Sequence, residues 1–347
     1  MATVSTQKST TVRSNPVPWS IRAAVSLGSM FAPQHTAERA LDLFTTPMSS
    51  SRTRAAKAEL GGARMQRIKV AGEAIAIYAW GEVGEQPTVL LSHGWSSFGL
   101  RFLPWVQMLR AEGYAVLAFD QPGHGRNSPA KITLPGFADT VLAVGQHFGP
   151  FAAAIGHSLG GAAIAVALRD GLRADRAVLI APAADGAAAS RRFARAIALP
   201  EDLRAAMQKR LERQTGREME ALAIHRVAPH LAQPALIVHD LADALGRHGP
   251  VRRLHVPPRG RTARHLRPRP RVAGPAASRA VSARASPSNA SSATHLWTSP
   301  QSAALAPPIF SPSIIISVAR ALPIRRGNIH VAPPSGTRPM LTKACRK

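Results

Sequence analysis

Short apolar runs alternate with longer amphipathic stretches between Met65 and Asp243. Five apolar runs have the length of buried strands: Thr88–Ser92, Ala115–Asp120, Phe151–Gly156, Ala177–Ala181 and Ala235–Val238. The helix-like stretches between them are Phe102–Glu112, Leu134–Phe148, Leu159–Asp170 and Ala188–His225. Upstream, Arg67–Val70 and Ala74–Trp80 flank turn residues 71–73 and predict a strand pair. Because strands that alternate with helices form βαβ units, we expect an α/β fold with a mostly parallel sheet flanked by helices.

Glycine-rich and polar segments follow four of the expected strands. They are Ser92-His93-Gly94-Trp95, the run 119–128 (FDQPGHGRNS), the run 156–161 (GHSLGG) and the run 234–243 (PALIVHDLAD). The carboxyl ends of parallel strands share one edge of a sheet, and ligands bind beyond that edge. We therefore expect these four segments to lie together.

The third segment, Gly156-His157-Ser158-Leu159-Gly160, is a G-x-S-x-G pattern between an expected strand and an expected helix. A serine on such a sharp turn has a strained backbone, and small flanking residues keep the strand and helix from colliding. The turn would expose the Ser158 hydroxyl at a helix N-terminus, where developing negative charge is stabilised. The alternative is a glycine-rich turn that only opens a packed helix.

Together these segments, in this order and spacing, resemble the α/β-hydrolase superfamily over residues of about 65 to 243. The resemblance implies that Ser158 is the nucleophile and that the backbone N–H groups of Leu159 and Trp95 form the oxyanion hole. It also implies supporting turns at four residues: His93, Gly94, Gly156 and Gly160. The same superfamily includes esterases, lipases, thioesterases and amidases, so it specifies the fold better than the substrate.

The family order of Ser, acid and then His places the acid at Asp243, with Asp185 as the second choice. The histidine has no clear position, because none of the downstream histidines follows a recognisable strand. Those histidines are His248, His255, His265, His295 and His330. We assign His265 as the base. His93, His124 and His157 occupy structural positions of the motifs.

The chain divides by charge at Ala244. Residues 1–243 contain 26 Lys or Arg and all 19 acidic residues, whereas residues 244–347 contain 18 Lys or Arg and no acid, out of a total net charge of +25. The basic tail is interpreted in three ways: a polyanion-binding tail, a disordered linker, or an out-of-frame translation of GC-rich DNA. We favour the third, because similarity to the family is lost at Ala244 in mid-motif and the last strand and helix of the fold are missing.

We therefore expect three parts: a helical or flexible N-terminal extension (1–60), the hydrolase core (61–243) with a small helical cap at about 183–233, and a disordered basic tail (244–347). An amphipathic helix over Pro18–Leu43 would lie on the domain or on a membrane surface. Within the cap, Glu201–Arg217 has one charged face. Its opposite face carries Leu203, Met207 and Leu211, which either pack on the domain or line an acyl pocket.

The function we expect is a cytoplasmic serine hydrolase that cleaves a small or medium carboxylic ester, with activity impaired by loss of the histidine region. The alternative is a non-catalytic hydrolase-like protein whose tail binds polyanions non-specifically. The partner is a small-molecule ester; no cofactor, metal or specific nucleic acid is expected, and no run reaches the roughly 18–20 apolar residues of a transmembrane segment. The single cysteine, Cys345, excludes a disulfide framework.

Overall fold

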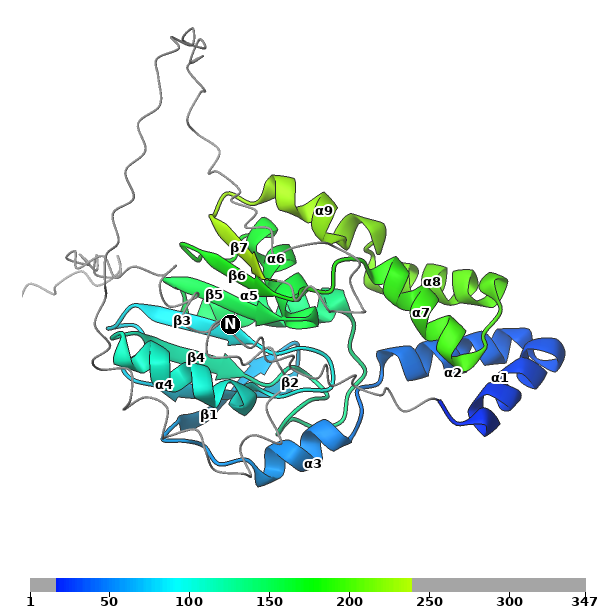
Figure 1. Ribbon diagram of the computed structural model, residues 1–347, viewed down its shortest axis with the longest axis horizontal. Helices are drawn as coiled ribbons and strands as arrows, with labels where there is room; N and C mark the ends of the chain where they lie inside the picture. The colour runs from blue at the N-terminus through cyan, green and yellow to red at the C-terminus, as the bar shows by residue number, and fades with distance from the viewer. Residues whose placement is uncertain (1–16, 239–347) are drawn as a thin grey trace, which may run out of the picture.

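The computed structural model describes residues 17–238 (Figure 1). Its centre is a seven-stranded sheet in the order β1-β2-β4-β3-β5-β6-β7. The strands are β1 (Arg64–Val70), β2 (Glu73–Trp80), β3 (Thr88–Ser92), β4 (Ala115–Phe119), β5 (Ala153–His157), β6 (Ala177–Ile180) and β7 (Ala235–Val238). The β1/β2 and β2/β4 pairs are antiparallel, and the other neighbours are parallel. The prediction of a mostly parallel α/β sheet is confirmed.

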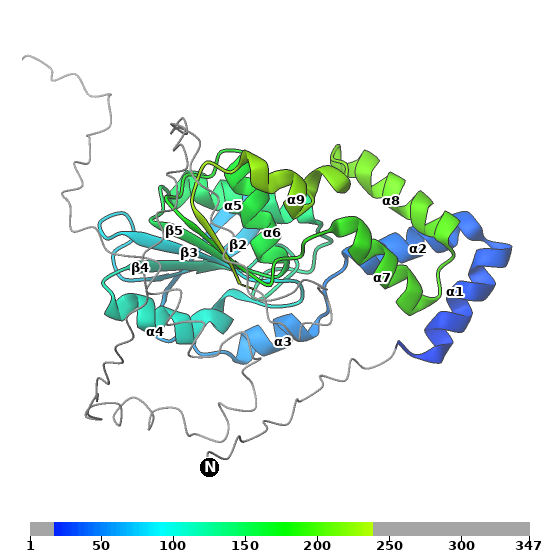
Figure 2. The ribbon, with the colours of Figure 1, turned by 45° about the horizontal axis from the view of Figure 1, so that its top comes forward.

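Helices cover both faces of this sheet. On one face lie α5 (Leu134–Phe148), α6 (Leu159–Arg169) and α9 (Ile224–Val227), and on the other lie α3 (Ser50–Lys57) and α4 (Leu103–Ala111) (Figure 2). Every residue of β3 and β4 is buried, as expected of parallel strands enclosed on both sides. Short 3₁₀ turns, η1 (Gly99–Phe102), η2 (Glu220–Leu222) and η3 (Ala228–His230), complete the connections.

Four helices form a separate lobe beyond the carboxyl edge of the sheet: α1 (Trp19–Phe31), α2 (Pro33–Thr45), α7 (Gly186–Ile197) and α8 (Glu201–Thr215) (Figures 1 and 2). We call these helices the cap lobe. Their shared apolar cluster includes Ala40 and Leu41 of α2 and Met207 and Leu211 of α8. Helices α1 and α2 therefore belong to the cap lobe, whereas α3 lies on the core.

The single helix expected over Pro18–Leu43 is wrong, because the chain breaks into α1 and α2 at Ala32. Pro33 lacks a backbone N–H and disfavours the helical conformation of the residue before it. Ala32 accordingly has φ −146° and ψ 62°. Helix α7 ends at Ala198, which adopts the left-handed conformation with φ 60°, and α8 begins directly after Pro200.

The described helices differ from membrane-spanning segments. No helix within residues 17–238 is both long enough and apolar enough to cross a bilayer. The exposed large apolar side chains lie mainly in the N-terminal part and include Trp19, Leu27, Met30 and Phe31 of α1. Asp243, His265 and the basic tail lie outside the described residues.

Candidate active site

Ser158 occupies a strained turn between β5 and α6. Its backbone has φ 53° and ψ −121°, which is unusual for a residue with a side chain. A Cβ atom on Gly160 would lie 2.3 Å from the carbonyl oxygen of His93, and one on Gly156 would lie 2.6 Å from the Cα of Gly161. Only glycine fits at either position, so the two glycines allow the close approach of strand and helix on which the turn depends.

The turn after β3 lies directly against this serine. A Cβ atom on Gly94 would lie 2.9 Å from the Cβ of Ser158. The next residue, Trp95, is partly exposed and packs its ring against Phe137, with centroids 6.2 Å apart. Within the described residues, the backbone N–H groups of Trp95 and Leu159 donate to no protein acceptor. The structure thus places both expected donors on segments that meet at Ser158.

Two buried histidines brace the loops around the site as neutral groups. His93 Nε2 accepts a hydrogen bond from the Gln121 N–H at 3.0 Å, and His124 Nε2 accepts one from the Ser96 N–H at 3.0 Å. Burial lowers the pKa of His93 to about 4 and that of His124 to about 3. The Nε2 lone pair of each neutral ring therefore accepts a hydrogen bond from a backbone N–H group of the neighbouring loop. The Nδ1 atoms of His93 and His124 lie 2.8 and 2.9 Å from the carbonyl oxygens of Gly94 and Pro122, so both nitrogens of each ring contact the backbone and not Ser158.

Asp120 is a second buried ionisable group of the same loops. Its carboxylate accepts hydrogen bonds from the Tyr78 hydroxyl at 2.6 Å and from the N–H groups of Gly99 and Arg126, both at 2.7 Å. Burial raises the pKa of Asp120, while the three donors oppose this change. The carboxylate thus ties β2 and the segment after β3 to the loop after β4, which is a structural role.

A largely apolar cavity of about 400 Å³ opens at Ser158 between the core and the cap lobe. Its lining comes from three parts of the chain. Side chains from the N-terminal segment, the core and the cap contribute, among them Leu43, Phe44, Met48, Trp95, Leu134, Ala189, Phe193, Leu211 and Met219. The rings of Phe44 and Phe193 are in contact, with centroids 5.1 Å apart. The N-terminal contributors were missed from the sequence, because no local motif marks a wall residue more than 100 positions from the nucleophile.

The expected roles of the cap residues divide between packing and lining. Leu203 and Met207 are buried against α2, whereas Leu211 packs in the same cluster and also lines the cavity. Asp185, the second-choice acid, lies at the cavity as the N-cap of α7. Its Oδ1 accepts from the Ala188 N–H at 3.0 Å, and its Oδ2 lies 3.7 Å from Arg191. This use of the carboxylate is that of a helix cap.

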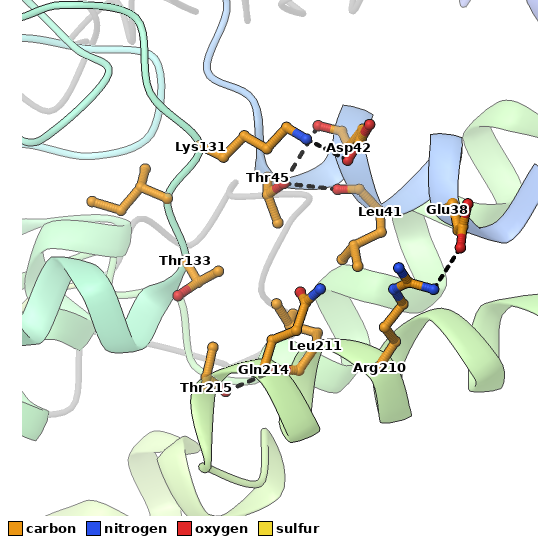
Figure 3. A pocket seen from close by; sticks show the side chains of 11 residues that line it. Glu38, Leu41, Asp42, Thr45, Lys131, Thr133, Arg210, Leu211, Gln214 and Thr215 are labelled. Carbon is orange, nitrogen blue, oxygen red and sulfur yellow. Dashed lines mark hydrogen bonds and ion pairs between the residues drawn. The ribbon is translucent and has the colours of Figure 1, made fainter. Parts of the chain in front are cut away.

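A polar pocket adjoins the apolar cavity and shares five lining residues with it: Thr45, Ile132, Thr133, Leu211 and Thr215. Two ion pairs cross this pocket, as Figure 3 shows: Lys131 with Asp42 and Arg210 with Glu38, both at 2.6 Å. They join α2 to the core and to α8. No group of three or more His, Cys, Asp or Glu side chains in the described part of the chain could hold a metal ion.

Comparison with known proteins agrees with this architecture. A family model described as "Alpha/beta hydrolase family" matches residues 89–342, which is most of the chain. The chain therefore belongs to the α/β-hydrolase family. The matched span continues past Ala244, so the change in composition there does not mark its end. A search of curated proteins found no match.

Among solved structures, the thioesterase domain from the curacin biosynthetic pathway is 20% identical, with a TM-score of 0.41 over 54% of this chain and 85% of that chain. A membrane phospholipase A described as a bacterial virulence factor is 19% identical, with a TM-score of 0.41 over 65% and 82%. Mouse alpha/beta hydrolase domain-containing protein 10 is 19% identical, with a TM-score of 0.39 over 53% and 80%. Likeness at this level leaves the reaction open.

Proposed function

We propose that this protein is a serine hydrolase that cleaves carboxylic esters with an apolar acyl group, by acyl transfer to Ser158. The observation that carries the proposal is the strained Ser158 turn opening into a mainly apolar cavity. Backbone strain at a non-glycine residue persists only where the surroundings enforce it, and such strain is common at catalytic sites. A turn that served packing alone would not need a partly exposed serine in the lining of this cavity.

In the proposed reaction, the Ser158 Oγ attacks the ester carbonyl carbon while a base removes the hydroxyl proton. The N–H groups of Trp95 and Leu159 stabilise the negative charge that develops on the carbonyl oxygen. The tetrahedral intermediate expels the alcohol, which takes a proton, and leaves an acyl-serine. Water then attacks the acyl-serine and releases the acid. No cofactor takes part in these steps.

The cavity supports an apolar acyl chain as the recognised group. Its lining is dominated by aliphatic and aromatic side chains, and its volume of about 400 Å³ is within the range of small-ligand sites. Each methylene buried in such a site contributes about 0.8 kcal/mol. We therefore expect medium-length acyl chains to be preferred over acetyl.

The base and acid remain proposals from the sequence, at His265 and Asp243. The family match continues past Ala244, so the expected loss of similarity there is wrong. Residues 244–347 nevertheless contain 18 Lys or Arg and no acid, and none of their histidines follows a recognisable strand. On these grounds we propose that the histidine region is out of frame and that this exact chain turns over slowly. Re-sequencing the DNA around codon 244 tests this part. If the frame is uninterrupted and no shifted frame encodes the missing strand and a Gly-His pair, the frameshift interpretation is wrong.

The central test compares wild type with Ser158→Ala on p-nitrophenyl octanoate and acetate and on a fluorophosphonate probe. We expect wild type to be labelled at Ser158, more slowly than an ordinary esterase, and to hydrolyse octanoate at least tenfold faster than acetate. Ser158→Ala should lose both activities. Equal rates for the two proteins would exclude Ser158 as the nucleophile, and labelling at an ordinary esterase rate would contradict the impaired turnover.

A second candidate function is favoured by the charge distribution. If Ser158 is inert, the protein is a non-catalytic member of the family whose 18 unopposed Lys and Arg residues beyond position 243 bind polyanions. DNA binding that weakens steeply with salt, together with an unreactive Ser158, would support this alternative.

A further inference from the structure

Ser96 lies next to the proposed oxyanion donor Trp95 and has a left-handed backbone, with φ 50°. This conformation is unfavourable for a residue with a side chain and has to be maintained by contacts. Ser96 is also buried, with 6% of its surface exposed. Neighbouring groups must therefore maintain this conformation of Ser96.

Every polar group of Ser96 has a partner. Its N–H donates to His124 Nε2, its hydroxyl accepts from the Met48 N–H, and its carbonyl accepts from the Arg54 guanidinium, each at 3.0 Å. Two of the three partners thus come from a segment more than 40 residues upstream. This segment, residues 46–57, includes α3 and the link from α2, and we call it the N-terminal clamp.

The N-terminal clamp is itself fixed to the loop after β4. Arg52 donates to the Gly123 carbonyl at 3.2 Å, and Arg126 donates to the carbonyls of Ala55 and Ala58 at 3.2 and 2.7 Å. Ala55 is fully buried. The clamp thus joins the turn after β3 to the loop after β4, which also carries His124.

We propose that Ser96 is a positioning residue that holds the Trp95 N–H in line with the oxyanion, and that Met48 and Arg54 of the N-terminal clamp maintain it. This inference rests on the proposed function. Oxyanion donors are effective because they are fixed before the charge develops, so a loosened loop weakens transition-state stabilisation without changing the binding cavity. The Met48 side chain lines that cavity, so one segment contacts both the acyl group and the oxyanion turn.

The test measures saturation kinetics of fluorophosphonate labelling at Ser158 in the full chain, which separates the maximal labelling rate from the probe affinity. Ser96→Ala removes the acceptor of the Met48 N–H and keeps the size of the residue nearly unchanged. We expect the maximal rate to fall about tenfold, less than the 10²–10³-fold expected for losing a donor outright, with affinity changed less than twofold.

Two comparisons separate positioning from general destabilisation. Ser97→Ala makes the same change one residue on, where the hydroxyl has no hydrogen bond within the described residues, and should label like wild type. Arg54→Met removes the donor to the Ser96 carbonyl and should slow labelling, whereas Arg54→Lys keeps a donor and should restore most of the rate.

The labelling results distinguish failure of the proposed function from failure of the inference about Ser96. A wild-type chain unlabelled at Ser158 would overturn the proposed function and this inference together. A labelled wild type with an unchanged maximal rate in Ser96→Ala, or an equal loss in Ser97→Ala, would overturn this inference alone. The inference would also be overturned if Arg54→Lys were labelled at Ser158 no faster than Arg54→Met.

Discussion

Two serines with left-handed backbones, Ser158 and Ser96, lie on adjoining turns at the carboxyl edge of the sheet. A residue other than glycine that is held in a sparsely populated backbone conformation costs roughly 1–3 kcal/mol. The cost at Ser158 is offset by the packing of β5 against α6, and the cost at Ser96 by hydrogen bonds to all its polar groups. The strained conformations of Ser158 and Ser96 are thus stabilised by different interactions.

The buried histidines make stability sensitive to pH. The pKa of His93 is lowered to about 4 and that of His124 to about 3, mainly by burial, against about 6.5 in the unfolded chain. Between pH 6.5 and 4 the unfolded state therefore binds more protons than the folded state. The free energy of unfolding should fall by about 2 kcal/mol per histidine from pH 7.5 to pH 5, which urea denaturation can measure.

Variants separate the contribution of the buried histidines to this pH dependence from the contributions of other titratable groups. His124→Asn should remove about half of the pH dependence, whereas His35→Gln, at an exposed position of α2, should leave it intact. Asp120 acts in the opposite sense, because burial raises its pKa and its protonation in the folded state stabilises the protein as pH falls. A pH dependence that is the same in His124→Asn as in wild type would refute neutral burial of that histidine.

At the scale of elements, the sequence predicted what local patterns encode. Five apolar runs, together with the strand pair that flanks residues 71–73, located all seven strands, and the glycines around Ser158 located the sharp turn. The packing of α2 on α8 could not be predicted, because the two helices are more than 150 residues apart and each shows only an ordinary apolar face. The hydrogen bond from Met48 to Ser96 was missed for the same reason, since a backbone donor leaves no mark in the sequence.

The contact between α2 and α8 depends on buried apolar side chains. Met207 of α8 has 1% of its surface exposed within the shared cluster, whereas Met30 of α1 is 75% exposed. Met207→Ala should lower the free energy of unfolding by about 2–3 kcal/mol, because it removes buried methylenes and leaves a cavity. Met30→Ala should change it by less than about 0.5 kcal/mol. Equal effects in chemical denaturation would show that the lobe is not held by this cluster.

At the scale of the whole molecule, three parts of the chain converge on Ser158. The core supplies the strained turn, and helices α7 and α8 of the cap lobe supply Phe193 and Leu211. The N-terminal segment, residues 17–57, supplies Phe44 of α2 and Met48. The ion pairs beside the cavity (Figure 3) have partners that are 44–59% exposed, and such pairs contribute about 0–1 kcal/mol. Burial of apolar surface is therefore the main interaction that closes the cavity.

Because the N-terminal segment lines the cavity, we predict that one of its residues determines the preference for acyl-chain length. Phe44→Ala removes a ring that lines the cavity and contacts Phe193. Labelling of Ser158 by a decyl fluorophosphonate should slow about tenfold, because contact with roughly two methylenes of chain is lost, while labelling by an ethyl analogue should change less than twofold. Phe31→Ala makes the same change at an 81% exposed position and should leave both rates unaltered. Parallel slowing of both probes in Phe44→Ala would instead mean that the N-terminal segment supports the core without selecting the substrate.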